Sequence, residues 1–235
     1  LEIGPDNVSG FVGETIMGGL VGDVPPAENY WQYIREVCTR YDVHLILDEV
    51  YCGTGTTGKI YCCDWDGIKP DFIFIGKTLA AGYGALSAVI TSSEVESIIK
   101  NGQGRLQHTT THQAHSLSVS AALAVQKIIH NDDFLSEIYS LGEYMRNTII
   151  KELGDHPFFY DVRGRGMRFS FEYDCKEKNK FGHRLQLEME QKHSVLINAK
   201  WHRVCFTPAL ILGKTKANQV LETFISTFKD VARGF

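Results

Sequence analysis

The stretch LILDEVYCGTGTTGK (residues 45–59) joins an apolar run, two adjacent carboxylates and a glycine-rich loop. Its glycines Gly53, Gly55 and Gly58 fit the spacing G-x-G-x-x-G of dinucleotide-binding loops. The run from Gly53 to Lys59 also fits the phosphate-binding spacing G-x-x-x-x-G-K. Asp48 and Glu49 stand directly before the glycines, where the apolar run ends. The fold and the function depend on whether the glycines or the acids carry the chemistry.

Both glycine motifs fail in their sequence context. A dinucleotide or phosphate loop leads into a helix whose N-terminus faces the phosphates. The residues that follow, KIYCCDWDGIKPD (59–71), have a turn-like composition and no helical apolar period. A phosphate loop also needs Ser or Thr after its lysine, and here that residue is Ile60. We therefore interpret the glycines as residues that permit a loop with positive φ angles near the carboxyl edge of a sheet.

Apolar runs and helical spacing elsewhere predict an α/β fold. The predicted strands are FVGETI (11–16), VHLIL (43–47), DFIFIG (71–76) and ALSAVIT (85–91), and the predicted helices span residues 27–41, 113–130 and 132–153. The order strand, helix, strand indicates a sheet with parallel neighbours.

The character of the chain changes near His156 and Pro157. Three aromatic or alternating strands follow: FFYDV (158–162), MRFSFEY (167–173) and RVCFTP (203–208). They are interleaved with helices expected over residues 180–193 and 215–232. We therefore predict a large α/β domain over residues 1–153 and a small C-terminal α+β domain over residues 154–235.

The composition is that of a soluble globular protein, with 43% hydrophobic and 22% charged residues and a net charge of −4. No basic run indicates a nucleic-acid partner, and no apolar stretch is long enough to span a bilayer. No signal peptide is recognisable, and the six cysteines lack metal-site spacing, so we expect reduced thiols, no metal and a cytoplasmic location. The missing initiator Met suggests a fragment or a processed chain.

Asp48 and Lys77 each follow a predicted strand, and they lie 77 − 48 = 29 positions apart in the sequence. Ligands of open α/β sheets bind outside the carboxyl ends of strands, and one intervening segment can bring both residues to the same edge. An aspartate and a lysine meeting there match the needs of pyridoxal phosphate. The lysine forms a Schiff base with the cofactor aldehyde, and the aspartate keeps the pyridine nitrogen protonated. The released lysine then acts as general base and acid.

These residues, taken in order, resemble the class III pyridoxal-phosphate-dependent aminotransferases of fold type I. The similar segments are ETIMGG (14–19), YIREVCTRYDVHLILDEV (33–50), GTGTTGK (53–59), PDFIFIGKTLAAGYGALSAVI (70–90), HTTTHQAHSLSVSAALAV (108–125), RGRGMRFSFE (163–172) and FTPAL (206–210). The resemblance implies part of the large, mainly parallel sheet domain of that fold and a small C-terminal α+β domain. It covers only the latter part of a family member, so we expect the front half to be missing.

The resemblance also implies roles for individual residues. Lys77 corresponds to the Schiff-base lysine and Asp48 to the partner of the pyridine nitrogen of pyridoxal phosphate. Val50 would pack against one face of the cofactor ring. Thr111, or one of the two threonines directly before it, would reach the cofactor phosphate of the neighbouring subunit. These assignments imply a homodimer with shared active sites.

Several positions depart from the family pattern. Tyr51 stands where the family commonly has Gln near the cofactor's ring hydroxyl, and Thr56 replaces a common arginine. Cys205 and Gly19 occupy the places of an arginine and a glutamate that form a substrate-carboxylate switch in some members. This loss argues against an ornithine- or GABA-type switch. Arg203 lies on the same predicted strand face as Cys205 and is either a substrate ligand or a surface arginine.

The resemblance implies an aminotransferase that moves an amino group between an amine or amino acid and a 2-oxo acid. An aminomutase, racemase or decarboxylase of the same cofactor chemistry is the alternative. A non-catalytic truncated subunit is a further alternative, and the presence of both Lys77 and Asp48 counts against it. The sequence names neither the amino donor nor the acceptor.

Overall fold

The computed structural model describes residues 2–235, which fold into two compact units. Unit 1 comprises the chain up to Ile16 together with Pro26–Gly55 and Lys59–Leu135. Unit 2 comprises Met17–Pro25, Thr56–Gly58 and Ser136–Phe235. Two short upstream segments therefore belong to the unit that contains the C-terminal part of the chain.

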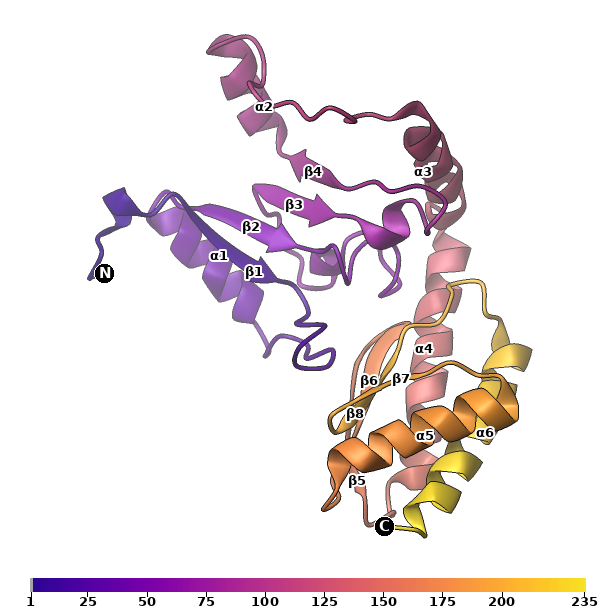
Figure 1. Ribbon diagram of the computed structural model, residues 1–235. Helices are drawn as coiled ribbons and strands as arrows, with labels where there is room; N and C mark the ends of the chain where they lie inside the picture. Colours follow the sequence, from indigo (N-terminus) through magenta and orange to yellow (C-terminus); the bar gives the residue numbers. More distant parts are fainter. Residues whose placement is uncertain (1) are drawn as a thin grey trace. The chain divides into compact units, whose positions relative to one another are not determined.

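Unit 1 is built on a four-stranded sheet with the order β1-β2-β3-β4 (Figure 1). The strands are β1 (Gly10–Glu14), β2 (His44–Asp48), β3 (Phe72–Ile75) and β4 (Ala88–Thr91). β1, β2 and β3 run parallel, as the sequence predicts, whereas β4 runs antiparallel to β3. Between β3 and β4 the chain forms only the short 3-10 helix η3 (Lys77–Leu79) and turns, so it makes no helical crossover of the kind that parallel neighbours need.

Helix α1 (Tyr30–Arg40) connects β1 to β2 and closes the core of unit 1. It buries Trp31 and Cys38 in one cluster with Leu45 and Leu47 of β2. The other helices of this unit are η1 (Pro5–Asn7), η2 (Cys62–Trp65), α2 (Ser93–Asn101) and α3 (Ser116–Ile129). The apolar runs of β2 and β3 are thus strands that pack under a helix and keep their carboxyl ends at one edge of the sheet.

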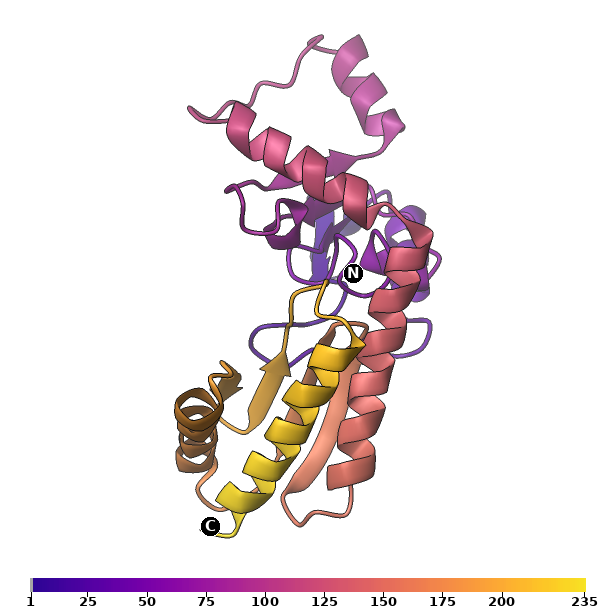
Figure 2. The same ribbon diagram turned by 90° about the vertical axis from the view of Figure 1, so that its right-hand side faces the viewer.

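Unit 2 contains an antiparallel sheet with the order β5-β6-β8-β7. Its strands are β5 (Phe159–Arg165), β6 (Arg168–Tyr173), β7 (Asn198–Lys200) and β8 (Arg203–Phe206), and its helices are α4 (Asp132–Leu153), α5 (Lys178–His193) and α6 (Lys214–Ala232). Figure 2 shows α4 and α6 side by side along this sheet. Lys229 Nζ of α6 lies 3.8 Å from Glu152 Oε2 of α4.

Aromatic side chains fill the core of unit 2. Phe171 of β6 packs edge-on against Phe224 and Phe228 of α6, with ring centroids 5.8 and 5.1 Å apart. Phe181 of α5 lies 5.2 Å from Phe228. The aromatic side chains of the last helix therefore lie on the face that covers the sheet.

The unit boundary near Leu135 precedes the domain limit predicted at residue 153. Most of α4 belongs to unit 2, where Met145, Ile149 and Leu153 are buried. Gly142 of α4 lies so close to the β5–β6 turn that a Cβ atom there would come within 1.9 Å of the carbonyl oxygen of Gly166. The apolar face of this helix thus belongs to the C-terminal core, while the extent of the two domains stays a prediction.

Three kinds of feature are absent from residues 2–235. None of the helices in this range is long and apolar enough to cross a membrane. No group of three or more His, Cys, Asp or Glu side chains is arranged to hold a metal ion. The range also contains no disulfide.

Candidate active site

Asp48 and Lys77 lie at the same edge of the unit 1 sheet. Asp48 is the last residue of β2, and Lys77 follows the end of β3 by two residues. The two strands are parallel neighbours, with Asp48 opposite Phe74 in register. The carboxyl ends of such strands form the usual ligand-binding edge of an α/β sheet. The structure therefore brings both residues to one edge, as expected, and their roles toward a cofactor stay predictions.

The backbone at Lys77 adopts an uncommon conformation. Its φ angle is 45°, in the left-handed region that residues with a side chain rarely adopt. The Lys77 side chain is exposed, and its Nζ lies 5.7 Å from the centroid of the Tyr51 ring. Strained conformations of this kind cluster at functional sites.

The carboxylate of Asp48 is half-buried and held by one hydrogen bond. Its Oδ1 accepts the N–H of Val50 at 2.9 Å, which fixes the turn after β2. Val50 packs beside the Lys77 turn, because a Cβ atom on Gly76 would lie 3.4 Å from Val50 Cγ1. The predicted packing of Val50 on a cofactor ring is not tested by these contacts.

Glu49 has a different environment from its neighbour Asp48. It is fully buried and accepts hydrogen bonds from Thr15 Oγ1 at 2.9 Å and from the N–H groups of Cys62 and Cys63 at 2.6 and 2.7 Å. Burial raises the pKa of this carboxyl above its ordinary value. Glu49 therefore anchors the 49–63 loop from within the core, a role that the sequence analysis missed and that strand alternation could have indicated.

The glycine-rich loop contains no helix start. Thr54, Gly55 and Gly58 have φ angles of 49°, 87° and 88°, and the chain then continues into η2. A Cβ atom on Gly55 would come within 2.7 Å of Ile129 Cγ2. The interpretation of the glycines as a positive-φ loop is confirmed, and a phosphate site at a helix N-terminus does not form there.

Thr111 is far along the chain from Asp48 and Lys77, in an exposed segment. It occupies a turn within residues 101–117, all of which are exposed. Thr110, one of the two alternatives, donates its N–H to Gln113 Oε1 at 3.1 Å. Within residues 2–235 no hydrogen bond or ion pair joins Thr111 to Asp48 or Lys77. The predicted contact of Thr111 with a cofactor phosphate stays a prediction.

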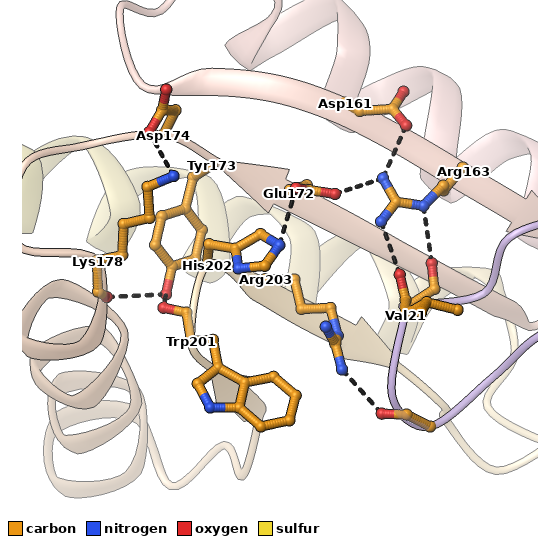
Figure 3. Close-up of polar contacts among 12 residues, drawn as sticks. Val21, Asp161, Arg163, Glu172, Tyr173, Asp174, Lys178, Trp201, His202 and Arg203 are labelled. Atoms are coloured by element: carbon orange, nitrogen blue, oxygen red, sulfur yellow. Dashed lines mark hydrogen bonds and ion pairs between the residues drawn. The ribbon is translucent and has the colours of Figure 1, made fainter.

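Arg203 of β8 is a buried residue, so the interpretation as a surface arginine is wrong. It is 2% exposed, its Nη2 donates to the carbonyl oxygen of Gly19 at 2.8 Å, and its guanidinium lies 4.9 Å from the Trp201 ring (Figure 3). Cys205 Sγ lies 3.3 Å from Ser170 Oγ. Of the two positions of the family's carboxylate switch, Gly19 thus offers its backbone carbonyl to Arg203, and Cys205 places its thiol beside the Ser170 hydroxyl.

A second arginine holds the segment Met17–Pro25 onto the unit 2 sheet. Arg163 donates from Nε to the carbonyl oxygen of Gly22 at 3.0 Å and from Nη2 to that of Val21 at 2.8 Å (Figure 3). Its Nη1 pairs with Asp161 and Glu172. The sequence does not predict this role, because no local pattern links β5 to a segment about 140 residues upstream.

The family of the chain follows from its sequence as a whole. Residues 2–228 match the family model for class III aminotransferases. The chain belongs to the class III aminotransferase family. Asp48 and Lys77, the two residues to which the family resemblance gives roles at the cofactor, lie at the carboxyl edge of its parallel strands.

Named relatives agree with the family assignment. A diaminobutyrate–2-oxoglutarate transaminase from Halomonas elongata is 39% identical over 176 residues, which cover 74% of this chain and 37% of the relative. An ornithine aminotransferase from Plasmodium yoelii yoelii is 30% identical over 230 residues, which cover 97% and 53%. This class III chain therefore spans about half or less of the length of these relatives.

Solved structures confirm the predicted fold. The chain is similar to an ornithine aminotransferase from Toxoplasma gondii, with a TM-score of 0.87, 25% sequence identity and coverage of 98% of this chain and 52% of that one. That structure is described as having partial occupancy of pyridoxal phosphate at its active site. The chain thus has the fold of these fold type I transaminases, with mixed α/β architecture and a mainly parallel sheet in unit 1.

Proposed function

We propose that the protein is a pyridoxal-phosphate-dependent aminotransferase that moves an amino group between an amine or amino acid and a 2-oxo acid. The observation that carries the proposal is the shared position of Asp48 and Lys77 at the carboxyl edge of neighbouring parallel strands. Family membership supports it, since the matched relatives are transaminases.

The residues at this edge fit pyridoxal phosphate chemically. Lys77 supplies an exposed primary amine, and no carboxylate among residues 2–235 lies within ion-pair distance of it. Asp48 has one oxygen engaged by the Val50 N–H, and the second carries no hydrogen bond within the described chain. A Cβ atom on Gly82 would meet no heavy atom within 4 Å, so the loop after Lys77 is open on that side.

When bound, the protonated pyridine ring of pyridoxal phosphate withdraws electrons from the bonds at the substrate's Cα. Asp48 would hold the proton at the ring nitrogen through its charge. Lys77 would bind the cofactor covalently through Nζ and, once released, move a proton to and from the substrate carbon. Val50 would exclude water from one face of the ring.

The proposal extends to partners and location. Thr111 would donate to the cofactor phosphate of a second subunit, so the protein would be a homodimer with shared sites, and the fully exposed 101–117 segment supports this. The location would be cytoplasmic. The amino donor would be one whose carboxylate needs no arginine at position 205, because Cys205 stands there.

A half-reaction experiment tests the proposed chemistry. The protein loaded with pyridoxal phosphate would be mixed with a panel of amines and amino acids without a 2-oxo acid. An aminotransferase converts the visible band of the lysine-attached cofactor into the near-ultraviolet band of the aminated cofactor, and a 2-oxo acid restores the visible band. Lys77→Ala should abolish turnover, since the proposal assigns both the covalent bond and the proton transfer to Lys77 Nζ.

Two outcomes would contradict the proposal. Racemisation or release of CO₂ without accumulation of the aminated cofactor would assign one of the other reactions of the same cofactor. Normal turnover in the Lys77→Ala variant would remove the lysine from the mechanism altogether.

A further inference from the structure

The side chain of Lys77 contacts an aromatic ring, that of Tyr51. Its amine lies over the aromatic ring of Tyr51, with Nζ 5.7 Å from the ring centroid. An ammonium group within about 6 Å of an aromatic face is attracted by the negative face of the ring. Tyr51 is half-buried and Lys77 exposed, so the ring offers a defined surface and the amine is the mobile group.

The two turns that carry these residues are joined to each other. The N–H of Glu49 donates to the carbonyl oxygen of Phe74 at 2.9 Å, which links the end of β2 to β3. Val50 packs against the position of Gly76, directly before Lys77. The turn that carries Tyr51 is therefore joined to the turn that carries Lys77, and the ring and the amine lie between the two turns.

The orientation of this lysine matters because its four-carbon chain has many rotamers. Free lysine side chains carry a large conformational entropy, which a single attractive surface reduces. The backbone of Lys77 is already confined to the left-handed region, at φ 45°. Backbone and ring together define one preferred position for the amine when it is not bonded to anything else.

We propose that the ring of Tyr51 is the resting place of the Lys77 amine whenever the lysine is not bonded to the cofactor, which makes Tyr51 a positioning residue. The inference rests on the proposed function. For attachment the ammonium would first lose a proton to water; the neutral amine would then join Nζ to the aldehyde carbon by a double bond, and the aldehyde oxygen would leave as water with the two amine hydrogens. Tyr51 takes no part in this balance. Its ring stabilises the released ammonium and so opposes attachment.

The first test observes the resting place without cofactor. In protein labelled with ¹³C at the lysine ε-carbons, the Lys77 signal, assigned with Lys77→Arg, should be shifted upfield by the ring current of Tyr51. The shift should vanish in Tyr51→Leu and persist in Tyr51→Phe, which keeps the ring. Tyr33→Leu, which removes an exposed tyrosine of α1, is the matched control and should leave the signal unchanged. A Lys77 signal with no ring-current shift would overturn the inference, whatever the cofactor does.

The second test measures the equilibrium of covalent attachment by absorbance titration with pyridoxal phosphate. Loss of an exposed cation–π contact corresponds to about a two- to five-fold change, so Tyr51→Leu should raise the attachment constant by about that factor. Phenylalanine at position 51 with increasing ring fluorination should give a graded rise, because fluorine weakens the ring's negative face without changing the fold. An unchanged or lower constant, or no gradient, would contradict the inference. A ring-current shift without any attachment to Lys77 would instead contradict the proposed function.

Discussion

At the scale of single residues, the two adjacent acids at the end of β2 have separate environments. Asp48 faces the carboxyl edge with one oxygen engaged, and Glu49 is buried and accepts three hydrogen bonds. Strand alternation explains the difference, since neighbouring residues of a strand point to opposite faces. Each acid therefore supports its own prediction.

Asp48→Asn should slow the amine half-reaction by about a hundredfold or more, because the amide cannot hold a proton on the pyridine nitrogen through charge. Single-turnover absorbance with a saturating amine measures this rate. Asp42→Asn is the matched control, since Asp42 is exposed and Asn tolerates its left-handed φ of 53°. A rate within twofold of the parent protein would remove the role proposed for Asp48.

Glu49→Gln should lower the free energy of unfolding by about 1–3 kcal/mol at neutral pH, because the Gln amide cannot accept the hydrogen bonds of both oxygens. Urea unfolding measures this change. Glu28→Gln, at an exposed position, should leave the unfolding free energy almost unchanged.

The difference in unfolding free energy between the parent protein and Glu49→Gln should depend on pH. Because burial raises the pKa of Glu49, the native state binds its proton more tightly than the unfolded state does. The parent protein should therefore lose stability relative to Glu49→Gln as the pH rises from about 4.5 through the raised pKa. If the stability advantage of the parent protein over Glu49→Gln stays constant or grows as the pH rises, the pKa of Glu49 is not raised.

At the scale of secondary-structure elements, the sequence predicts what is periodic and buried. The strands β1, β2 and β3 and the helices α1 and α6 carry apolar runs or one-sided faces, and they lie within a few residues of the predicted ranges. Helix α2 was missed because it buries none of its side chains. Strand β7 was missed because its three residues, Asn198–Lys200, show no apolar alternation.

The sequence predicts the two strand-end residues of the candidate site but not the side-chain contacts around them. Asp48 and Lys77 follow apolar strands, and this position in the sequence is enough to place them at one edge. The contacts of Tyr51 with Lys77, of Glu49 with the 62–63 backbone and of Arg203 with Gly19 depend on side-chain directions and on the fold of distant segments. Such contacts leave no periodic signal in the sequence.

Phe228→Ala should destabilise unit 2 by about 3–5 kcal/mol, because the ring is fully buried among four other aromatic residues and histidine. Urea unfolding followed by circular dichroism measures the change. Ile211→Ala removes a side chain that is 80% exposed and should change stability by less than about 0.5 kcal/mol. Equal effects of the two substitutions would contradict the aromatic core.

At the scale of the whole molecule, the proposal places a residue of a second subunit at each site. Thr111→Ala should weaken cofactor binding by about tenfold through loss of one hydrogen bond to phosphate, whereas Thr109→Ala should not. Equilibrium dialysis against pyridoxal phosphate measures both affinities. Equal affinities in Thr111→Ala and the parent protein would mean that another residue holds the phosphate.

Mixed dimers of Lys77→Ala and Thr111→Ala subunits separate a shared site from a site within one chain. If the sites are shared, one site of each mixed dimer contains both original residues and regains full affinity and covalent attachment. If each chain forms its site alone, no such site exists, and the mixture behaves as the sum of the two variants.

The central claim is that the Lys77 amine holds pyridoxal phosphate covalently. Borohydride reduction of the cofactor-loaded protein, followed by proteolysis and mass spectrometry, locates the bond directly. We expect the reduced cofactor on the peptide that contains Lys77 and on no peptide of the Lys77→Ala variant. Recovery of the cofactor on another lysine, or no covalent attachment in the parent protein, would contradict the account.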